Sequence, residues 1–129
     1  MNGKIKILLV DDDSFLLNMY SMKFGKSDCE VKTAGGGSDA LNILKGGFKP
    51  DILVLDLIMP EMDGFTIYEN IKKNNLAPGA IAVILTNQGL SSDINRAKEL
   101  GFHGYIVKAT TIPSEVVEEV LDIYKKNKK

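Results

Sequence analysis

Residues 51–64 read DILVLDLIMPEMDG, and the first half of this stretch indicates the fold class. The run from Ile52 to Leu55 is apolar without alternation, which is typical of a parallel strand that is buried on both faces. Asp56 ends the run, and Pro60 and Gly64 follow in a segment with the composition of a turn. Residues 51–56 are therefore predicted to form a central strand that ends in a carboxylate.

Four further runs share this short, apolar and β-branched character, at residues 5–10, 31–34, 81–86 and 104–107. Between and after the five runs, apolar residues recur at helical spacing, within residues 15–24, 40–44, 65–71, 94–100 and 116–124. The alternation predicts an α/β fold of (βα)5 type, a doubly wound, flavodoxin-like, parallel five-stranded sheet. The expected strand order is 2-1-3-4-5.

Helix boundary signals agree with this pattern. Ser38 is expected to precede the second helix, and Ser91 or Ser92 the fourth. Gly101 is expected to end the fourth helix, and Pro113 to open the fifth.

Composition sets the broad class. The 129 residues, 44% hydrophobic and 26% charged, predict one domain spanning residues 1–129 with a core at about 4–125. Sixteen basic and 17 acidic residues nearly cancel, so no direct nucleic-acid binding is expected. The apolar runs are too short to span a bilayer and the N-terminus lacks a secretory signal, which favours a cytoplasmic address. Cys29 is the single cysteine, so no internal disulfide is expected.

Polar side chains stand at the predicted carboxyl ends of four strands. Asp11 and Asp12 follow the first strand, Asp56 the third, Thr86 the fourth and Lys108 the fifth. Taken singly, an aspartate here has a structural explanation as a helix cap or turn residue, and Asp13 is expected to be such a cap. Taken together, these residues are expected at the switch point between strands one and three, where open α/β sheets bind ligands.

Clustered aspartates repel one another unless a cation neutralises them. A hard divalent cation is the natural occupant, and Mg2+ is favoured over Ca2+ because few carboxylates are available. A metal beside a free carboxylate, with a lysine and a hydroxyl, is suited to phosphoryl transfer. That free carboxylate would be the nucleophile and would form an acyl phosphate.

Four segments carry a resemblance to a known family. They read ILLVDDD at residues 7–13, VLDLIMPEMDG at 54–64, ILT at 84–86 and GYIVK at 104–108, and they resemble the receiver domain of two-component response regulators. The resemblance implies that Asp56 accepts a phosphoryl group from a sensor histidine kinase or phosphotransfer protein. It also implies a Mg2+ site formed by Asp12 directly, Asp11 directly or through water, Asp56, and the backbone carbonyl of Ile58.

The same resemblance assigns the signalling residues. Thr86 is similar to the switch hydroxyl, Tyr105 to the aromatic residue that changes rotamer with it, and Lys108 to the lysine that contacts the phosphoryl oxygens. Phosphorylation is expected to shift the face of helix four, strand five and helix five, where an output partner docks. The expected protein is a phosphorelay switch and not an enzyme beyond its own phosphorylation and dephosphorylation. It would be a monomer or a phosphorylation-linked homodimer, without membrane contact.

Two residues depart from the family pattern. Ala109 stands where the family has a proline, so the Lys108–Ala109 bond is left open between trans and cis. Asn87 is larger than the small residue that usually follows Thr86, and it is expected to narrow access to the phosphoryl group. Both departures support the alternative of a degenerate receiver that works through binding alone.

Two further alternatives belong to other classes. An aspartate-nucleophile phosphatase would use Asp11 and Asp13, which have the required spacing, although no cap domain insertion is present. A flavodoxin-type FMN protein would share the fold but needs a phosphate-binding loop after the first strand, which this sequence lacks.

Overall fold

Five strands and five α-helices alternate along the chain in this computed structural model, which describes residues 4–128. The strands are β1 (Ile5–Val10), β2 (Cys29–Ala34), β3 (Ile52–Leu55), β4 (Ile81–Thr86) and β5 (Gly104–Val107). The helices are α1 (Ser14–Gly25), α2 (Gly37–Lys45), α3 (Gly64–Lys73), α4 (Ser91–Leu100) and α5 (Pro113–Asn127). One turn of 3-10 helix, η1 (Lys108–Thr110), joins β5 to α5.

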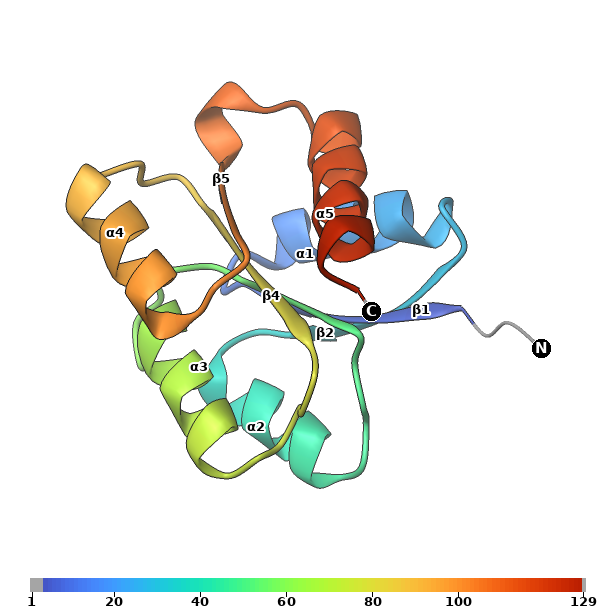
Figure 1. Cartoon of the computed structure of the whole chain (residues 1–129). Helices are drawn as coiled ribbons and strands as arrows, with labels where there is room; N and C mark the ends of the chain where they lie inside the picture. Colours follow the sequence, from blue (N-terminus) through green and yellow to red (C-terminus); the bar gives the residue numbers. More distant parts are fainter. Residues whose placement is uncertain (1–3, 129) are drawn as a thin grey trace.

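The strands form one parallel sheet in the order β2-β1-β3-β4-β5, which confirms the predicted topology. Figure 1 shows α1 and α5 together on one side of the sheet and α2, α3 and α4 on the other. The chain runs outward from β1 to β2 in one direction and through β3 to β5 in the other. The carboxyl ends of β1 and β3 therefore border the crevice at which ligands bind in such sheets.

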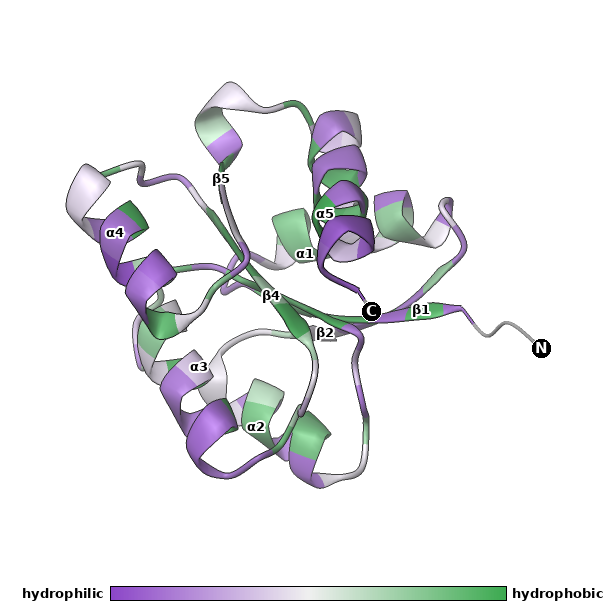
Figure 2. Cartoon of the chain, viewed as in Figure 1, coloured by the Kyte–Doolittle hydropathy of each residue, from purple (hydrophilic) through white to green (hydrophobic). Residues whose placement is uncertain are grey.

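Side chains alternate between two cores along each central strand. In β1, Ile7 and Leu9 face the core beneath α1 and α5, whereas Leu8 and Val10 face the core beneath α2, α3 and α4. All four are at most 1% exposed, because a helical layer covers each face of the sheet. Figure 2 shows the outer surfaces of α3, α4 and α5 as mainly hydrophilic and β4 as mainly hydrophobic.

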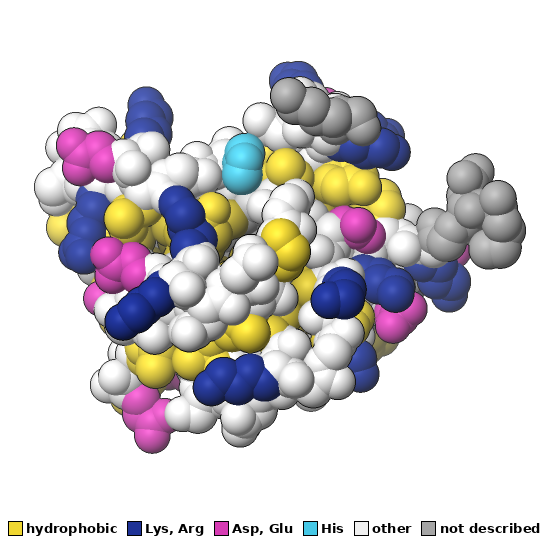
Figure 3. Space-filling view, turned by 60° about the horizontal axis from the view of Figure 1, so that its bottom comes forward, with side chains coloured by type: hydrophobic (Ala, Val, Ile, Leu, Met, Phe, Trp, Pro, Cys, Tyr) yellow, Lys and Arg dark blue, Asp and Glu magenta, His cyan; other side chains and the backbone are white. Residues whose placement is uncertain are grey.

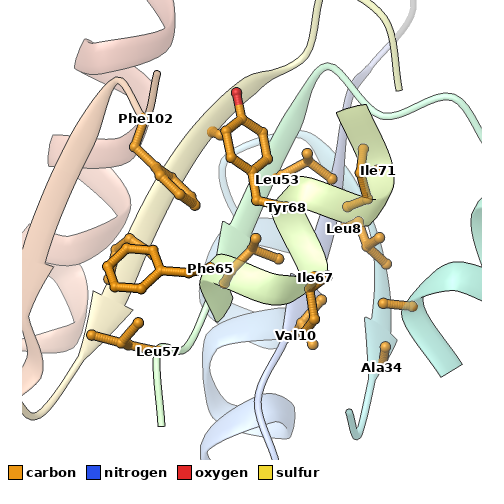
Figure 4. Close-up of a cluster of buried hydrophobic side chains, with 14 of the residues drawn as sticks. Leu8, Val10, Ala34, Leu53, Leu57, Phe65, Ile67, Tyr68, Ile71 and Phe102 are labelled. Atoms are coloured by element: carbon orange, nitrogen blue, oxygen red, sulfur yellow. The ribbon is translucent and has the colours of Figure 1, made fainter. Parts of the chain in front are cut away.

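An aromatic cluster joins α3 to the end of α4 (Figure 4). The ring of Phe102 lies 4.2 Å from that of Tyr68 and 6.1 Å from that of Phe65, measured between centroids. Lys72 on α3 donates a hydrogen bond of 2.8 Å to the carbonyl of Leu100, the last residue of α4. The C-terminal end of α4 is thus held by both apolar and polar contacts.

The observed boundaries correct several sequence predictions. β2 begins at Cys29, two residues before the predicted start. The reason is that Cys29 and Glu30, which precede the predicted run, also pair with β1. β3 spans only the apolar run Ile52–Leu55 and leaves both flanking aspartates outside. The prediction that serines precede the second and fourth helices is wrong. Ser38 lies within α2, whose N-cap is Gly36, and Ser91 is the first residue of α4.

The other predicted boundary signals are confirmed. Asp13 caps α1, and its carboxylate accepts hydrogen bonds from the backbone N–H groups of Phe15 and Leu16. Gly101 ends α4 with a φ of 95°, a left-handed conformation that favours glycine. Pro113 is the first residue of α5.

Gly64 lies where the start of α3 approaches the backbone of Asp56. A Cβ atom at this position would stand 2.5 Å from the Asp56 carbonyl oxygen, which is too close for a backbone atom that cannot move away. We expect Gly64→Ala to lower the free energy of unfolding by about 3 kcal/mol, as measured by urea denaturation. Gly25→Ala is the control, since a Cβ at Gly25 meets nothing within 4 Å. Equal stability of the two variants would contradict this close approach.

Candidate functional site

The two acidic segments at the switch point are held by backbone hydrogen bonds that extend the sheet. The N–H of Asp56 donates to the carbonyl of Val10 at 2.9 Å, and the N–H of Asp11 donates to the carbonyl of Ala34 at 3.1 Å. Both aspartates therefore lie at the carboxyl edge of the sheet, as predicted. Their side chains are 4% exposed for Asp11 and 9% for Asp56, so two carboxylates are buried side by side.

Three carboxylates converge at this edge. Asp11, Asp12 and Asp56 each offer an oxygen within 4.8 Å of the others. Asp12 is exposed, whereas the other two are buried. They border an open pocket of about 510 Å³. Its full lining consists of Asp11, Asp12, Asp13, Leu16, Asp56, Ile58, Thr86, Asn87, Gln88 and Lys108.

Lys108 supplies the positive charge of the site. Its ammonium group forms a short hydrogen-bonded ion pair with Asp11 and lies 3.4 Å from Asp56. The lysine side chain is 6% exposed, so it is shielded from water together with its partners. No cis peptide bond occurs within residues 4–128, so the Lys108–Ala109 bond is trans and begins the η1 turn. The trans bond still directs the ammonium group into the acidic pocket.

Burial and charge shift the ionisation of this pair in a consistent way. Burial raises the pKa of the Asp56 carboxyl, and the attraction of Lys108, a Thr86 hydrogen bond and the Ile58 N–H offset this only in part. Burial alone would lower the pKa of Lys108, but the hydrogen bond with Asp11 and the charge of Asp56 outweigh it, so the pKa is raised. Lys108 is therefore held as a cation beside a carboxylate that lacks full solvation.

The predicted switch residues occupy neighbouring positions. Thr86 ends β4 with 1% exposure, and its hydroxyl accepts a hydrogen bond of 3.5 Å from the N–H of Gln88. Tyr105 in β5 is half-buried, and its hydroxyl donates to the backbone carbonyl of Gln88. Ile58 is 55% exposed at the pocket, and its N–H donates to Asp56 at 3.4 Å. The role predicted for the Ile58 carbonyl remains a prediction.

Sequence reasoning missed the polar link between this loop and α4. The side-chain amide of Gln88 donates a hydrogen bond of 2.8 Å to the carboxylate of Asp93, in the first turn of α4. The only available signal was the position of Gln88, two residues after Thr86, and it does not specify a partner. His103 is exposed at the surface (Figure 3), and its Nδ1 accepts a hydrogen bond from the N–H of Ala82.

The donor set fits a small, hard cation. Three carboxylates that can each direct one oxygen to a common point are the ligands that Mg2+ and Ca2+ prefer, and the open pocket leaves room for water ligands. Nitrogen and sulfur ligands are absent from the residues that line the pocket, apart from the cationic Lys108, which cannot bind a metal. The acidic triad therefore fits a magnesium site.

Comparison with known proteins identifies the family. Residues 7–120 match the response regulator receiver domain. The response regulator VraR of Staphylococcus saprophyticus is 34% identical over 122 residues, which are 93% of this chain and 56% of VraR. The transcriptional regulatory protein GlrR of Escherichia coli is 34% identical over 102 residues, which are 79% of this chain and 22% of GlrR. The chain spans about half the length or less of the curated relatives that it matches.

Solved structures share the fold. The chemotaxis protein CheY4 of Vibrio cholerae superposes with a TM-score of 0.86 at 24% identity, covering 94% of this chain and 99% of CheY4. The BeF3-activated receiver domain of DrrB, from Thermotoga maritima, gives a TM-score of 0.80 at 27% identity, covering 95% of this chain and 98% of that one.

The chain therefore belongs to the response regulator receiver domain family. This domain is a phosphoacceptor of two-component signalling. Within residues 4–128, no helix is both long and apolar enough to cross a membrane.

Proposed function

We propose that Asp56 is the phosphoacceptor and that Lys108, Thr86 and the acidic pair before α1 form its catalytic surroundings. The observation that carries this assignment is the contact of one buried ammonium group with carboxylates from two strands, beside an open pocket. Asp56 differs from Asp12 in being buried, and from Asp11 in not forming the short ion pair with Lys108. Its contacts with Lys108 and with the Ile58 N–H are both 3.4 Å long, so its carboxylate is held less tightly than that of Asp11 and can react with a phosphoryl donor.

The reaction is an in-line displacement at phosphorus. A carboxylate oxygen of Asp56 forms a bond to the phosphorus atom while the phosphorus–nitrogen bond of a phosphohistidine donor breaks. The leaving imidazole keeps the electron pair. Lys108 lies within 3.4 Å of Asp56, close enough to pair with a phosphoryl oxygen as negative charge develops there. The hydroxyl of Thr86 is a donor for a second phosphoryl oxygen.

Asp11, Asp12, Asp56 and the backbone carbonyl of Ile58 would hold Mg2+. The bound cation would supply positive charge that offsets the phosphoryl oxygens and relieves the repulsion among the carboxylates. Mg2+ suits this site better than Ca2+ because three carboxylates leave several coordination positions to water. The chain itself contributes the orientation of the acceptor and the compensating charge of Lys108.

The phosphoryl group would act on the face formed by α4, β5 and α5. Thr86 and Tyr105 both contact Gln88, so a turn of the threonine hydroxyl toward the phosphoryl group changes the hydrogen bonds of the loop that leads into α4. An output partner would recognise this face in the phosphorylated state.

The same family membership supports a proposal for the cellular setting. Residues 1–129 would act as one receiver domain in the cytoplasm, phosphorylated by a histidine kinase or a phosphotransfer protein. The domain would be a monomer or a phosphorylation-linked homodimer, without direct contact to nucleic acid or membrane.

The phosphatase alternative has no support in the geometry. Its second aspartate would be Asp13, whose carboxylate is occupied in capping α1. Its nucleophile would be Asp11, which is paired with Lys108 and accepts the N–H of Asp13 at 2.9 Å. Neither carboxylate is free to attack a phosphorus atom.

The proposal is tested by intact mass spectrometry after incubation with acetyl phosphate. We expect an adduct of a single phosphoryl group with Mg2+, and none when EDTA replaces it, because the acidic triad then remains uncompensated. A phosphoryl adduct that hydrolyses quickly would escape detection by mass spectrometry. Binding of beryllofluoride, followed by NMR at the amides of Asp56 and Ile58, distinguishes this case from a site that takes no phosphoryl group. Absence of both signals would contradict the proposal and support a degenerate receiver.

Thr86 provides a second prediction. We expect Thr86→Ala to accept the phosphoryl group but to lose most of the beryllofluoride-induced change in the Tyr105 amide resonance, because no hydroxyl remains to follow the ligand. Thr86→Ser keeps the hydroxyl and should retain the response. A full response in Thr86→Ala would exclude the switch role of Thr86.

A further inference from the structure

Helix α4 is held very differently at its two ends. At its C-terminal end, Lys72 donates to the carbonyl of Leu100, and Phe102 packs among the aromatic rings of α3. At its N-terminal end, Leu90 precedes the helix without any side-chain capping bond and is 55% exposed. Ala97 is the one buried residue of α4, so its first turn has little apolar contact with the core. The position of the N-terminal end therefore depends on polar contacts.

Gln88 contributes the side-chain contact that restrains this end. Its amide nitrogen donates to the carboxylate of Asp93 at 2.8 Å, and both residues are half-buried. Its backbone contacts the two predicted switch residues, since its N–H donates to the Thr86 hydroxyl and its carbonyl accepts from Tyr105. One residue thus contacts the end of β4, the middle of β5 and the first turn of α4.

We propose that the hydrogen bond between Gln88 and Asp93 is the link through which a phosphoryl group at Asp56 repositions the N-terminal end of α4. In this arrangement Gln88 is a positioning residue. Movement of Thr86 toward the phosphoryl group releases the Gln88 N–H, Tyr105 follows the Gln88 carbonyl, and the side-chain amide transmits the displacement to Asp93. The C-terminal end of α4, held by Lys72, remains in place, so the helix tilts about that end.

The charge distribution agrees with this link. Burial raises the pKa of Tyr105, and the carboxylates of Asp93 and Asp56 raise it further, so the tyrosine senses charge at both the acceptor and α4. A neutral amide is the appropriate partner for Asp93, because a carboxylate at position 88 would repel the Asp93 carboxylate. The raised pKa of Tyr105 keeps its hydroxyl protonated and able to donate a hydrogen bond.

The inference rests on the proposed function of Asp56, and the experiment separates the two. Beryllofluoride is added with Mg2+ to the full chain, and NMR follows two groups of amides: Asp56 and Ile58 for ligand binding, and Ile94 and Ala97 for the response of α4. Asp93→Ala is the principal variant because Asp93 does not line the acidic pocket. We expect normal binding signals and a response of α4 that is about threefold smaller, which is the size of effect that the loss of one half-exposed hydrogen bond produces.

Three controls distinguish a link from a general structural effect. Asp93→Asn keeps an acceptor for the Gln88 amide and should retain the response, whereas Glu99→Ala removes an exposed carboxylate elsewhere on α4 and should change nothing. The double variant Gln88→Glu with Asp93→Gln exchanges donor and acceptor, so that the amide at position 93 donates to the carboxylate at position 88. Because a hydrogen bond again joins the two positions, the response of α4 that is reduced in Asp93→Ala should be retained in this variant. An undiminished response in Asp93→Ala would overturn the link, and absent binding signals in the unmodified chain would overturn the function of Asp56 and the link together.

Discussion

Asp56→Asn is expected to abolish the phosphoryl adduct completely while leaving the fold intact. An amide cannot act as the nucleophile that forms an acyl phosphate, and the substitution keeps the size and shape of the buried side chain. Intact mass spectrometry with acetyl phosphate and Mg2+ measures the loss. An adduct that persists at full level in Asp56→Asn would place the acceptor at another residue, with Asp12→Asn as the next variant to test.

The same variant should be more stable than the unmodified chain at neutral pH. Burial raises the pKa of Asp56, so ionised Asp56 is less stable in the fold than in the unfolded chain. The contribution of Asp56 to the free energy of unfolding is therefore most favourable below the ordinary pKa of an aspartate, where the carboxyl is protonated. This contribution is lost as the pH rises through the raised pKa of Asp56 in the folded protein. The advantage of Asp56→Asn should therefore be larger at about pH 7 than at about pH 4, in urea denaturation with EDTA present. A constant difference would contradict the raised pKa.

Lys108→Met is expected to have the second largest effect, on both stability and phosphorylation. The ammonium group of Lys108 neutralises the negative charges of Asp11 and Asp56, and all three side chains are less than 10% exposed. Removing one partner from a buried ion pair leaves the other charges uncompensated, so we expect the free energy of unfolding to fall by about 3 kcal/mol without metal. Mg2+ should recover part of this loss by binding to the same carboxylates.

The rate of phosphorylation by acetyl phosphate should fall on the order of 100-fold in Lys108→Met, because the developing charge on the phosphoryl oxygens loses its cation. Lys126→Met is the matched control. Lys126 pairs with Asp122 at 3.0 Å but is 73% exposed, and such pairs contribute little. If the two variants lose stability to the same extent, the compensation assigned to Lys108 is wrong.

The fold could be predicted because its signals are local and repeated. The unbroken apolar run from Ile52 to Leu55 requires cover on both faces, and the helical segments on either side supply it. The main features of the site could then be predicted from the topology. Parallel strands end at one edge of the sheet, so Asp11, Asp56 and Lys108 are expected to meet there whatever their side-chain conformations.

The parts that could not be predicted depend on side-chain geometry in loops. Sequence placed Lys108 at the site but could not show that its closer partner is Asp11, since that choice depends on how η1 directs the lysine. The link from Gln88 to Asp93 depends in the same way on a turn between β4 and α4. The helix start at Gly37 depends on packing: a Cβ there would stand 2.8 Å from the sulfur of Met62. None of these contacts has a local sequence signature.

The ion pair between Lys108 and Asp11 joins residues that are 97 positions apart in the chain. During synthesis on the ribosome, the aspartates emerge long before the lysine that compensates them. A nascent chain that stops before β5 therefore has an acidic cluster without its cation, and the sheet lacks its last strand. Completion of the phosphoacceptor site is thus a late event in biosynthesis, so a histidine kinase would meet a competent acceptor only after nearly the whole domain has been translated.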